Sequence, residues 1–430
     1  MPAPDSLAAL RDPLFRRFAL GRIVSVLGAQ MVSLAVGFQL YERTGSAFAL
    51  GAVGLVELVP VLFLALPAGH LADRFSRRDV AIFAHAVLAL SSLGLALVAV
   101  LHGPIAAIYA LLFCTGVGVA FRSPSVGAIL PQLLPPGQFN TANAWLSSGN
   151  ELATIAGPAL GGFAIALTSG ETWAYGLACG THLIFIALLS TLPRNEPARL
   201  NPGGGRSLRQ QARPSWPDLL AGLHFVLRTR LFLAAITLDL FAVLLGGATA
   251  LLPIFAKDIL HTGAVGLGLL RAAPALGALA MALVQTRLAP WKRPGVVLLW
   301  TVAGFGAATV VFGLSRNFAL SFAMLALTGL FDNISVVIRL TLEQLLTPDS
   351  MRGRVSAVHH VFIGLSNELG SFESGATAAL VGPLASVVGG GLGTILVVAL
   401  VAWNWPVLAA LGPLGQMDAA EAQPEPTAAP

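Results

Sequence analysis

Long apolar stretches alternate with short polar connections along the whole chain. The stretches are dominated by Leu, Ala, Val and Gly, and each reaches the roughly 20 residues that an α-helix needs to cross the hydrocarbon core of a bilayer. None shows the segments of about ten residues with alternating apolar and polar positions that are typical of membrane barrels. The pattern therefore predicts an all-α membrane protein with twelve transmembrane helices, over roughly 19–41, 47–72, 79–101, 104–132, 139–168, 172–192, 231–256, 264–286, 294–314, 318–346, 354–381 and 384–409.

Composition and charge placement agree with this pattern. Hydrophobic residues make up 56% of the 430 residues and charged residues only 10%, which is typical of integral membrane proteins. Most of the 25 Lys and Arg residues fall in alternate connections, and positive charges near span ends are retained in the cytoplasm. We therefore expect a multi-pass protein of the cell (inner) membrane with both termini cytoplasmic. The net charge of +5 then reflects topology, and we expect no nucleic-acid partner.

The longest interior connection is polar and divides the predicted spans six and six. Its last part, SWPDLLAGLHFVLRTR, predicts an amphipathic surface helix with Trp216 and Phe225 toward lipid and Arg228 and Arg230 toward headgroups. The predicted organisation is a six-helix bundle over 1–192, a cytoplasmic linker over 193–230, a second six-helix bundle over 231–409 and a cytoplasmic tail over 410–430.

The two predicted bundles share an internal repeat, which is common in transporters. GLVELVP (54–60) corresponds to GLLRAAP (268–274), and QLLPP (132–136) corresponds to QLLTP (344–348). The tripeptide Asn-Glu-Leu occurs at 150–152 and again at 367–369. These matches keep the same order and similar spacing, so they indicate a duplicated half.

The charged stretch GHLADRFSRR (69–78) between the second and third spans resembles the G-x-x-x-D-R-x-G-R-R signature of the major facilitator superfamily, with Ser76 in place of the second glycine. ATIAGPALGG (153–162) resembles the span-5 motif of its drug:proton antiporter branch, with Ala153 in place of the first glycine. The run from Met351 to Gly375 resembles the group that contains enterobactin and macrolide exporters. The matching residues are Gly69, Asp73, Arg74, Arg77 and Arg78 for the gating motif, and Gly157, Pro158, Gly161 and Gly162 for the antiporter motif.

The resemblance implies two pseudo-symmetric six-helix bundles that work by alternating access. It also implies that Asp73 meets the start of span 11, near Arg352, and holds the halves together on the cytoplasmic side. An acid has no part in positive-inside sorting, whereas Arg77 and Arg78 also fit the alternative of enforcing topology alone.

Charges within the spans need a partner or a task, because one charge at mid-membrane costs at least about 2.5–3.5 kcal/mol. The resemblance packs span 5 against span 8, which predicts a pair between Arg271 and Glu151. It packs span 2 against span 11, so Glu57 would face Glu368 or Glu373. Close carboxylates favour protonation of one of them, which makes these glutamates proton-coupling candidates. The alternative is that they hydrogen-bond to backbone and only pack helices.

Asp332, Arg339 and Glu343 lie on one face of the predicted tenth span, and we expect Arg339 and Glu343 to form an ion pair. The resemblance lines the transport cavity with spans 1, 4, 7 and 10, so Asp332 would meet the intramembrane charges of the other three spans there. Structural pairing is the alternative to a functional role. Asp332 leads as the cavity proton carrier and Glu57 as the interface carrier. The remaining members of the group are Arg22, Arg122 and Asp239.

No HExxH, GxSxG or paired-aspartate motif supports an intramembrane enzyme, and we expect no cofactor and no metal. The predicted function is secondary active transport: efflux of a hydrophobic or amphipathic small molecule, of drug or siderophore type, in exchange for protons. Multidrug resistance and siderophore export are the corresponding roles. The alternative is a lysophospholipid flippase or a small-molecule importer of the same fold. The expected partners are the bilayer, the substrate and the proton gradient, with the protein a monomer.

Overall fold

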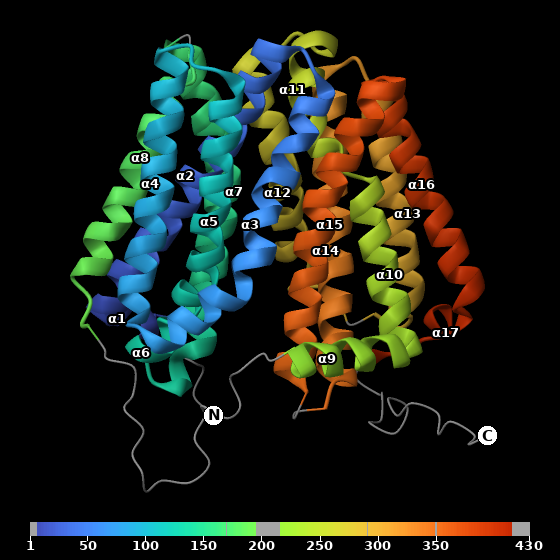
Figure 1. Cartoon of the computed structure of the whole chain (residues 1–430). Coiled ribbons are helices and arrows are strands. Elements are labelled where there is room, and N and C mark those ends of the chain that lie inside the picture. The colour runs from blue at the N-terminus through green and yellow to red at the C-terminus, as the bar shows by residue number, and fades with distance from the viewer. Residues whose placement is uncertain (1–6, 169, 195–215, 290, 349–350, 415–430) are drawn as a thin grey trace, which may run out of the picture. The chain divides into compact units, whose positions relative to one another are not determined.

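The computed structural model describes residues 7–168, 170–194, 216–289, 291–348 and 351–414, and all regular structure in these ranges is helical (Figure 1). Most of the predicted linker and tail lies outside them. The long helices are α2 (Pro13–Thr44), α3 (Ala47–Arg74), α4 (Arg77–Val100), α5 (Ile105–Gly127), α7 (Phe139–Thr168), α8 (Thr172–Ser190), α10 (Arg230–Leu245), α12 (Gly263–Gln285), α13 (Pro294–Leu314), α14 (Phe318–Leu346), α15 (Arg352–Val381) and α16 (Pro383–Asn404). The short ones are α1 (Ala8–Arg11), α6 (Leu130–Leu133), α9 (Trp216–Arg228), α11 (Leu252–Ile254) and α17 (Pro406–Ala409).

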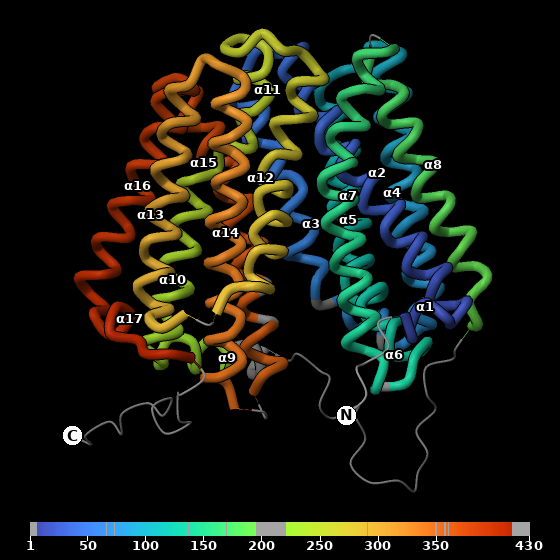
Figure 2. The backbone as a smooth tube through the Cα atoms, turned by 180° about the vertical axis from the view of Figure 1, so that it is seen from behind, coloured from blue at the N-terminus to red at the C-terminus, as the bar shows by residue number. Residues whose placement is uncertain are grey.

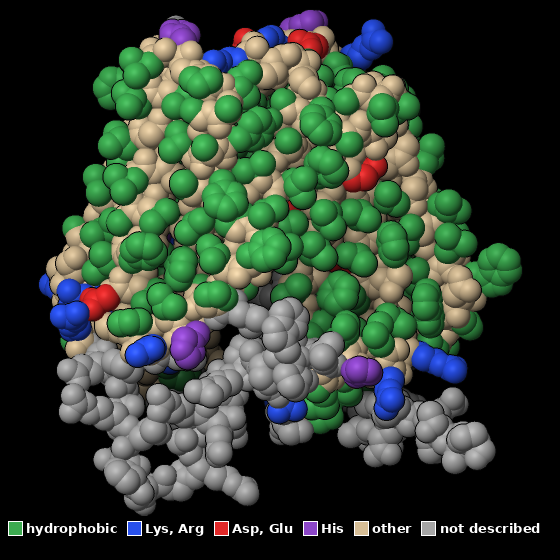
Figure 3. Space-filling view, viewed as in Figure 1, with side chains coloured by type: hydrophobic (Ala, Val, Ile, Leu, Met, Phe, Trp, Pro, Cys, Tyr) green, Lys and Arg blue, Asp and Glu red, His purple; other side chains and the backbone are tan. Residues whose placement is uncertain are grey.

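Within the described residues, eleven helices are long and apolar enough to cross a membrane. The predicted span 354–381 is the exception in composition, although it forms the 30-residue helix α15. This helix carries Glu368 and Glu373 among several serines, so its mean hydropathy is lower. Hydrophobic side chains cover the middle of the helices on the face seen in Figure 3, whereas most Lys, Arg and His side chains lie near helix ends.

Local sequence signals explain where the helices begin and end. The carboxylate of Asp12 accepts hydrogen bonds from the backbone N–H groups of Leu14 and Phe15, at 2.7 and 2.9 Å, which satisfies orphan donors in the first turn of α2. That helix ends where Gly45 adopts φ +58°, a left-handed conformation that glycine reaches without steric cost.

Contacts divide the chain into two units: the first comprises Met1–Gly203 and Leu252–Ala272, and the second comprises Gly204–Leu251 and Ala273–Pro430. In the first unit α2 packs against α7 and α8, while α5 packs against α3 and α4. In the second unit α13 packs against α14 and α16, and α10 packs against α15 and α16. The segment Leu252–Ala272 therefore groups with the first unit by its contacts, although the sequence-based division assigns it to the second bundle.

The predicted seventh span is interrupted. Helix α10 ends at Leu245, and Gly246–Gly247 leads into a 3-10 turn, the short α11 and a π-helical turn over Phe255–Ile259. A Cβ atom at Gly247 would lie 2.9 Å from the carbonyl oxygen of Gly370. Gly247 thus permits a close crossing of this chain segment with α15, and the regular helix α10 ends just before it.

The predicted amphipathic helix forms as α9, which lies across the ends of α10 and α15 (Figures 1 and 2). Arg228 and Arg230 are exposed, as expected. Phe225, however, packs against the core of its own unit beside the buried Val226, because the bundle covers the apolar face that the sequence assigned to lipid. The side chain of Trp216 is outside the described residues.

Candidate functional site: a polar hollow in the second unit

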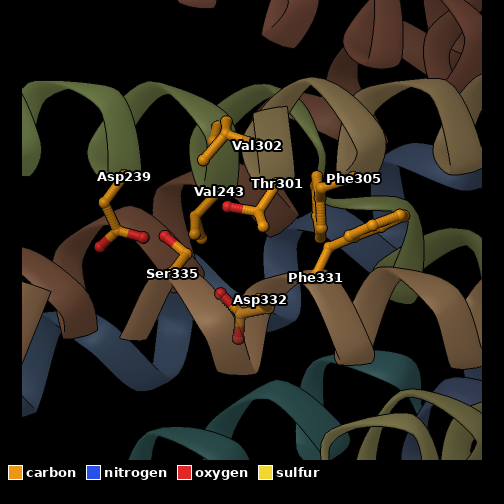
Figure 4. A pocket seen from close by; sticks show the side chains of 9 residues that line it. Asp239, Val243, Thr301, Val302, Phe305, Phe331, Asp332 and Ser335 are labelled. Carbon is orange, nitrogen blue, oxygen red and sulfur yellow. The ribbon is translucent and has the colours of Figure 1, made fainter. Parts of the chain in front are cut away.

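A small hollow lies among α10, α13 and α14, all within the second unit (Figure 4). Each helix contributes polar and apolar groups to its wall. The side chains that matter most are Asp239 from α10, Thr301 and Phe305 from α13, and Phe331, Asp332 and Ser335 from α14.

Helical spacing brings these groups to one place. Asp332 and Ser335 are three residues apart and share one face of α14, and Thr301 and Phe305 share one face of α13 in the same way. Close helix packing then holds the aromatic side. A Cβ atom at Gly304 would lie 2.8 Å from Cζ of Phe331, so the ring lies directly over glycine backbone.

Arg339 gives the site its charge pattern. Its guanidinium forms an ion pair with the carboxylate of Asp239, and its Nη2 lies 3.9 Å from Oδ1 of Asp332. The side chains of Arg339 and Asp239 are only 4% and 11% exposed, whereas that of Asp332 is 48% exposed. With both acids ionised the three residues carry one net negative charge, and Asp332 is the accessible carboxylate.

A second buried pair lies next to this cluster in the same unit. The carboxylate of Glu343 contacts Nδ1 of His359, and both residues are buried. The predicted ion pair between Arg339 and Glu343 is therefore wrong, because each side chain has a different partner. Side chains on a helix lean toward its N-terminus, so Arg339 reaches back toward Asp332 while Glu343 lies one turn in the other direction.

The other charged residues that the sequence placed within spans either lie in the first unit or would pair with residues of the other unit. Arg271 donates to the hydroxyl of Ser33, and Glu151 is exposed; their mutual pairing stays a prediction. The meeting of Glu57 with Glu368 or Glu373, and that of Arg22 and Arg122 with the aspartates, would join the two units and also stays a prediction. Glu373 accepts a hydrogen bond from Thr377 at 2.8 Å within its own helix.

The loop of the gating motif is held by its arginines. Arg77 donates to the carbonyl oxygen of Ala128 at 2.8 Å, and Arg78 donates to that of Leu192 at 2.7 Å. These bonds support a structural role for both arginines within the first unit. The side chain of Asp73 is outside the described residues. Ser76 adopts φ −57°, so the turn requires no glycine at this position.

The antiporter motif packs α7 closely against two neighbours in the first unit. A Cβ atom at Gly157 would lie 2.8 Å from the carbonyl oxygen of Leu27 in α2, and one at Gly162 would lie 2.4 Å from that of Ala264 in α12. The glycines therefore allow backbone-to-backbone contact of the kind that small residues give in membrane helices.

Sequence reasoning missed two polar clusters in the first unit. Nδ1 of His85 lies 3.3 Å from Nδ1 of His182, and the hydroxyl of Ser25 lies 3.4 Å from each. Histidines inside apolar spans were the available signal, but they are 97 residues apart, so only packing reveals that they meet.

The second cluster joins the end of α2 to the segment Leu252–Ala272. Tyr41 donates to the carboxylate of Asp258, and Nζ of Lys257 lies 2.9 Å from Oε2 of Glu42. The same Nζ lies 5.6 Å from the centroid of the Tyr41 ring, within the range of a cation–π contact. These contacts attach the segment to the first unit.

The membrane-length helices show a multi-pass membrane protein, and a charged hollow lies among three of them. A family model described as Major Facilitator Superfamily matches residues 18–371, and the chain belongs to this superfamily of secondary transporters.

Curated relatives are similar over nearly the whole chain. The chain is 30% identical over 390 residues to the enterobactin exporter EntS of Citrobacter koseri, covering 90% of both proteins. It is 29% identical to EntS of Escherichia coli O1:K1 over the same length and coverage.

Solved structures share the fold at low identity. A bacterial homolog of the human lysosomal transporter Spinster has a TM-score of 0.70 and 14% identity, covering 94% of this chain and 96% of the other. A mutant of the peptide transporter POT has a TM-score of 0.72 and 12% identity, covering 93% and 95%. The nucleoside transporter NupG has a TM-score of 0.66 and 14% identity, covering 94% and 100%.

Proposed function

We propose that this transporter exports a hydrophobic or amphipathic small molecule from the cytoplasm in exchange for protons, with Asp332 as the group that carries the proton. The observation that supports this most directly is the hollow, where a half-exposed carboxylate lies beside a buried ion pair. The relatives, which are named as enterobactin exporters, support the outward direction and a role in siderophore or drug efflux.

The charge pattern suggests how the proton would be taken up and released. Asp239 is compensated by Arg339, so one proton on Asp332 makes the three-residue cluster neutral. A neutral cluster tolerates dry surroundings, whereas a charged one needs water or a counter-charge. Alternate exposure of Asp332 to the two sides of the membrane would therefore load it on one side and discharge it on the other.

The proposal includes the organisation expected from the sequence. Two six-helix bundles would alternate as a monomer with both termini in the cytoplasm, and the motif around Asp73 would hold the cytoplasmic side closed near Arg352. Glu57, Glu368 and Glu373 remain candidates for additional proton sites between the bundles.

A proteoliposome experiment tests the function and the carrier together. The protein is reconstituted with a pH dye inside, and proton movement is followed as candidate substrates are driven along their gradient. We expect coupled proton flux for the unmodified protein and loss of coupling in Asp332→Asn, which keeps the shape of the side chain but removes its titration. Proton coupling that survives in this variant would rule out Asp332 as the carrier. Substrate transport by the unmodified protein that does not depend on the pH gradient would rule out proton exchange.

A further inference from the structure

Helix α9 has one face that is fixed against the second unit. Val226 is buried in the hydrophobic core of that unit, and Leu223 and Phe225 pack against the same core. A Cβ atom at Gly222 would lie 2.8 Å from the carbonyl oxygen of Arg354 in the first turn of α15, so the two backbones are in close contact. The opposite face of α9 is therefore the one that the unit leaves open to its surroundings.

That outer face of α9 combines basic and apolar side chains. Leu227 is 52% exposed, and His224 and Arg228 are exposed as well. Positions three and four residues apart lie on the same side of a helix, so these three residues form one strip along α9. A surface helix with this combination is typical of the boundary between the headgroups and the acyl chains of a bilayer.

Two further basic residues lie at the same end of the second unit. Lys292 and Arg293 directly precede α13 and are exposed. The short helix α17 packs against both α10 and α13, with Gly295 of α13 directly against the carbonyl oxygen of Leu408, and Figures 1 and 2 show α17 beside α9. Arg228, Lys292 and Arg293 form no ion pair with any residue that the structure describes. Three cations without a counter-charge among the described residues therefore lie at this end.

Tryptophan residues gather at this end as well. Four of the seven in the chain lie there: Trp216 in α9, Trp291 just before α13, and Trp403 and Trp405 where α16 gives way to α17. Trp291 and Trp405 pack against the core of the unit, whereas Trp403 is 81% exposed. Figure 3 shows Lys and Arg side chains next to hydrophobic ones along its lower right edge. Trp is enriched at membrane–water interfaces because its ring is amphipathic, so this end has the composition of a headgroup-binding surface.

Charge decides which kind of lipid fits. Guanidinium and ammonium groups donate to phosphate oxygens in strong, charge-assisted hydrogen bonds, and basic residues near a bilayer surface attract anionic lipids. A zwitterionic choline lipid also carries a phosphate, but its trimethylammonium group would meet like charge here. Basic residues that only enforce topology require no tryptophan beside them.

We propose that the surface formed by Leu227, Arg228, Lys292, Arg293 and Trp403, here called the α9–α17 surface, binds an anionic phospholipid. The three basic residues receive the phosphate oxygens and the net negative charge of the headgroup, and Leu227 and Trp403 lie against the glycerol and the acyl chains. A bound lipid would hold α9 in place, and with it the first turn of α15, because the two backbones are in contact. The inference does not depend on which substrate or ion is transported.

Lipid retention by the purified full-length protein tests this. The protein in detergent is titrated with micelles that contain dioleoylphosphatidylglycerol or dioleoylphosphatidylcholine, which have the same acyl chains, and native mass spectrometry counts the lipids bound. We expect the first phosphatidylglycerol to bind at least about tenfold more tightly than the first phosphatidylcholine, a difference of ~1.4 kcal/mol. Raising the ammonium acetate concentration should reduce this preference, because salt screens exposed charges.

Variants locate the site. Lys292→Gln/Arg293→Gln should remove most of the preference for phosphatidylglycerol, and Arg228→Gln should weaken it several-fold, while retention of phosphatidylcholine stays unchanged. Arg16→Gln/Arg17→Gln is the matched control, because these two residues are also adjacent, basic and exposed but belong to the first unit. Thermal unfolding of each variant confirms that it is folded.

Three outcomes would overturn the inference. Equal retention of the two lipids, or an equal loss in Arg16→Gln/Arg17→Gln, would leave the basic residues of the α9–α17 surface with a role in topology alone. The third outcome concerns residues 415–430, which carry Asp418, Glu421 and Glu425 and no Lys or Arg. A preference for phosphatidylglycerol that appears only after these three acids are replaced by their amides in the full-length protein would assign the surface to the chain's own tail instead.

Discussion

At the scale of single residues, Arg339 gives the two aspartates of the hollow different environments. Asp239 is buried against the guanidinium, whereas Asp332 lies 3.9 Å from it and is 48% exposed. An ion pair inside the bundle contributes little net stability, but losing one member leaves a buried charge uncompensated. This asymmetry leads to a testable consequence for stability.

Arg339→Gln should lower the free energy of unfolding by about 3–5 kcal/mol, because it leaves Asp239 ionised and buried without its partner. The double variant Asp239→Asn/Arg339→Gln should recover most of this loss, since two neutral amides replace the charges. Thermal unfolding in detergent, followed by intrinsic fluorescence, measures both. Arg316→Gln, at an exposed loop position, serves as the control and should shift stability by less than ~0.5 kcal/mol. Additive losses in the double variant would contradict a direct interaction.

At the scale of helices, glycines determine how closely neighbours approach. Gly162 in α7 faces the carbonyl oxygen of Ala264. Across the same contact, a Cβ atom at Gly268 in α12 would lie 2.5 Å from the carbonyl oxygen of Pro158. The antiporter motif is thus a packing surface in this structure, whatever further part it plays in transport.

Gly162→Ala should destabilise the protein by about 1–3 kcal/mol, because the added methyl group forces α7 and α12 apart. Gly180→Ala in α8 is the matched control: no atom lies within 4 Å of its Cβ position, so the substitution should be neutral or stabilising by up to ~1 kcal/mol through helix propensity. Size-exclusion profiles after graded heating compare the two variants. Equal thermal stability would show that the close contact has no energetic importance.

At the scale of the whole molecule, alternating access requires that contacts on the cytoplasmic side form and break. Asp73→Asn should leave folding and membrane insertion intact but greatly lower transport, since it removes the one acid of the gating motif. Asp79→Asn is the nearby control, because Asp79, in the first turn of α4, forms an exposed ion pair with Arg194 at 2.8 Å, a kind of contact worth about 0–1 kcal/mol. Uptake into vesicles is measured for both. Full activity in Asp73→Asn would limit the motif to membrane topology.

Parts of the site could be predicted from sequence and parts could not. The shared face of Asp332 and Arg339 follows from helical period alone. The partner of Arg339 did not follow, because Asp239 lies on another helix and the nearest acid in the sequence pattern, Glu343, pairs with His359 instead. The histidine pair His85 and His182 likewise depends on which helix faces meet.

Sequence by itself determined the type and the approximate positions of the long helices, because backbone groups in a bilayer must be satisfied within each segment and apolar stretches of sufficient length allow this. Tertiary structure decided which side chains meet. It placed Leu252–Ala272 with the first unit, turned Phe225 into the core and set Asp239 against Arg339. These choices depend on helix rotation and crossing, and a period of 3.6 residues specifies the faces of a helix without specifying which neighbour each face contacts.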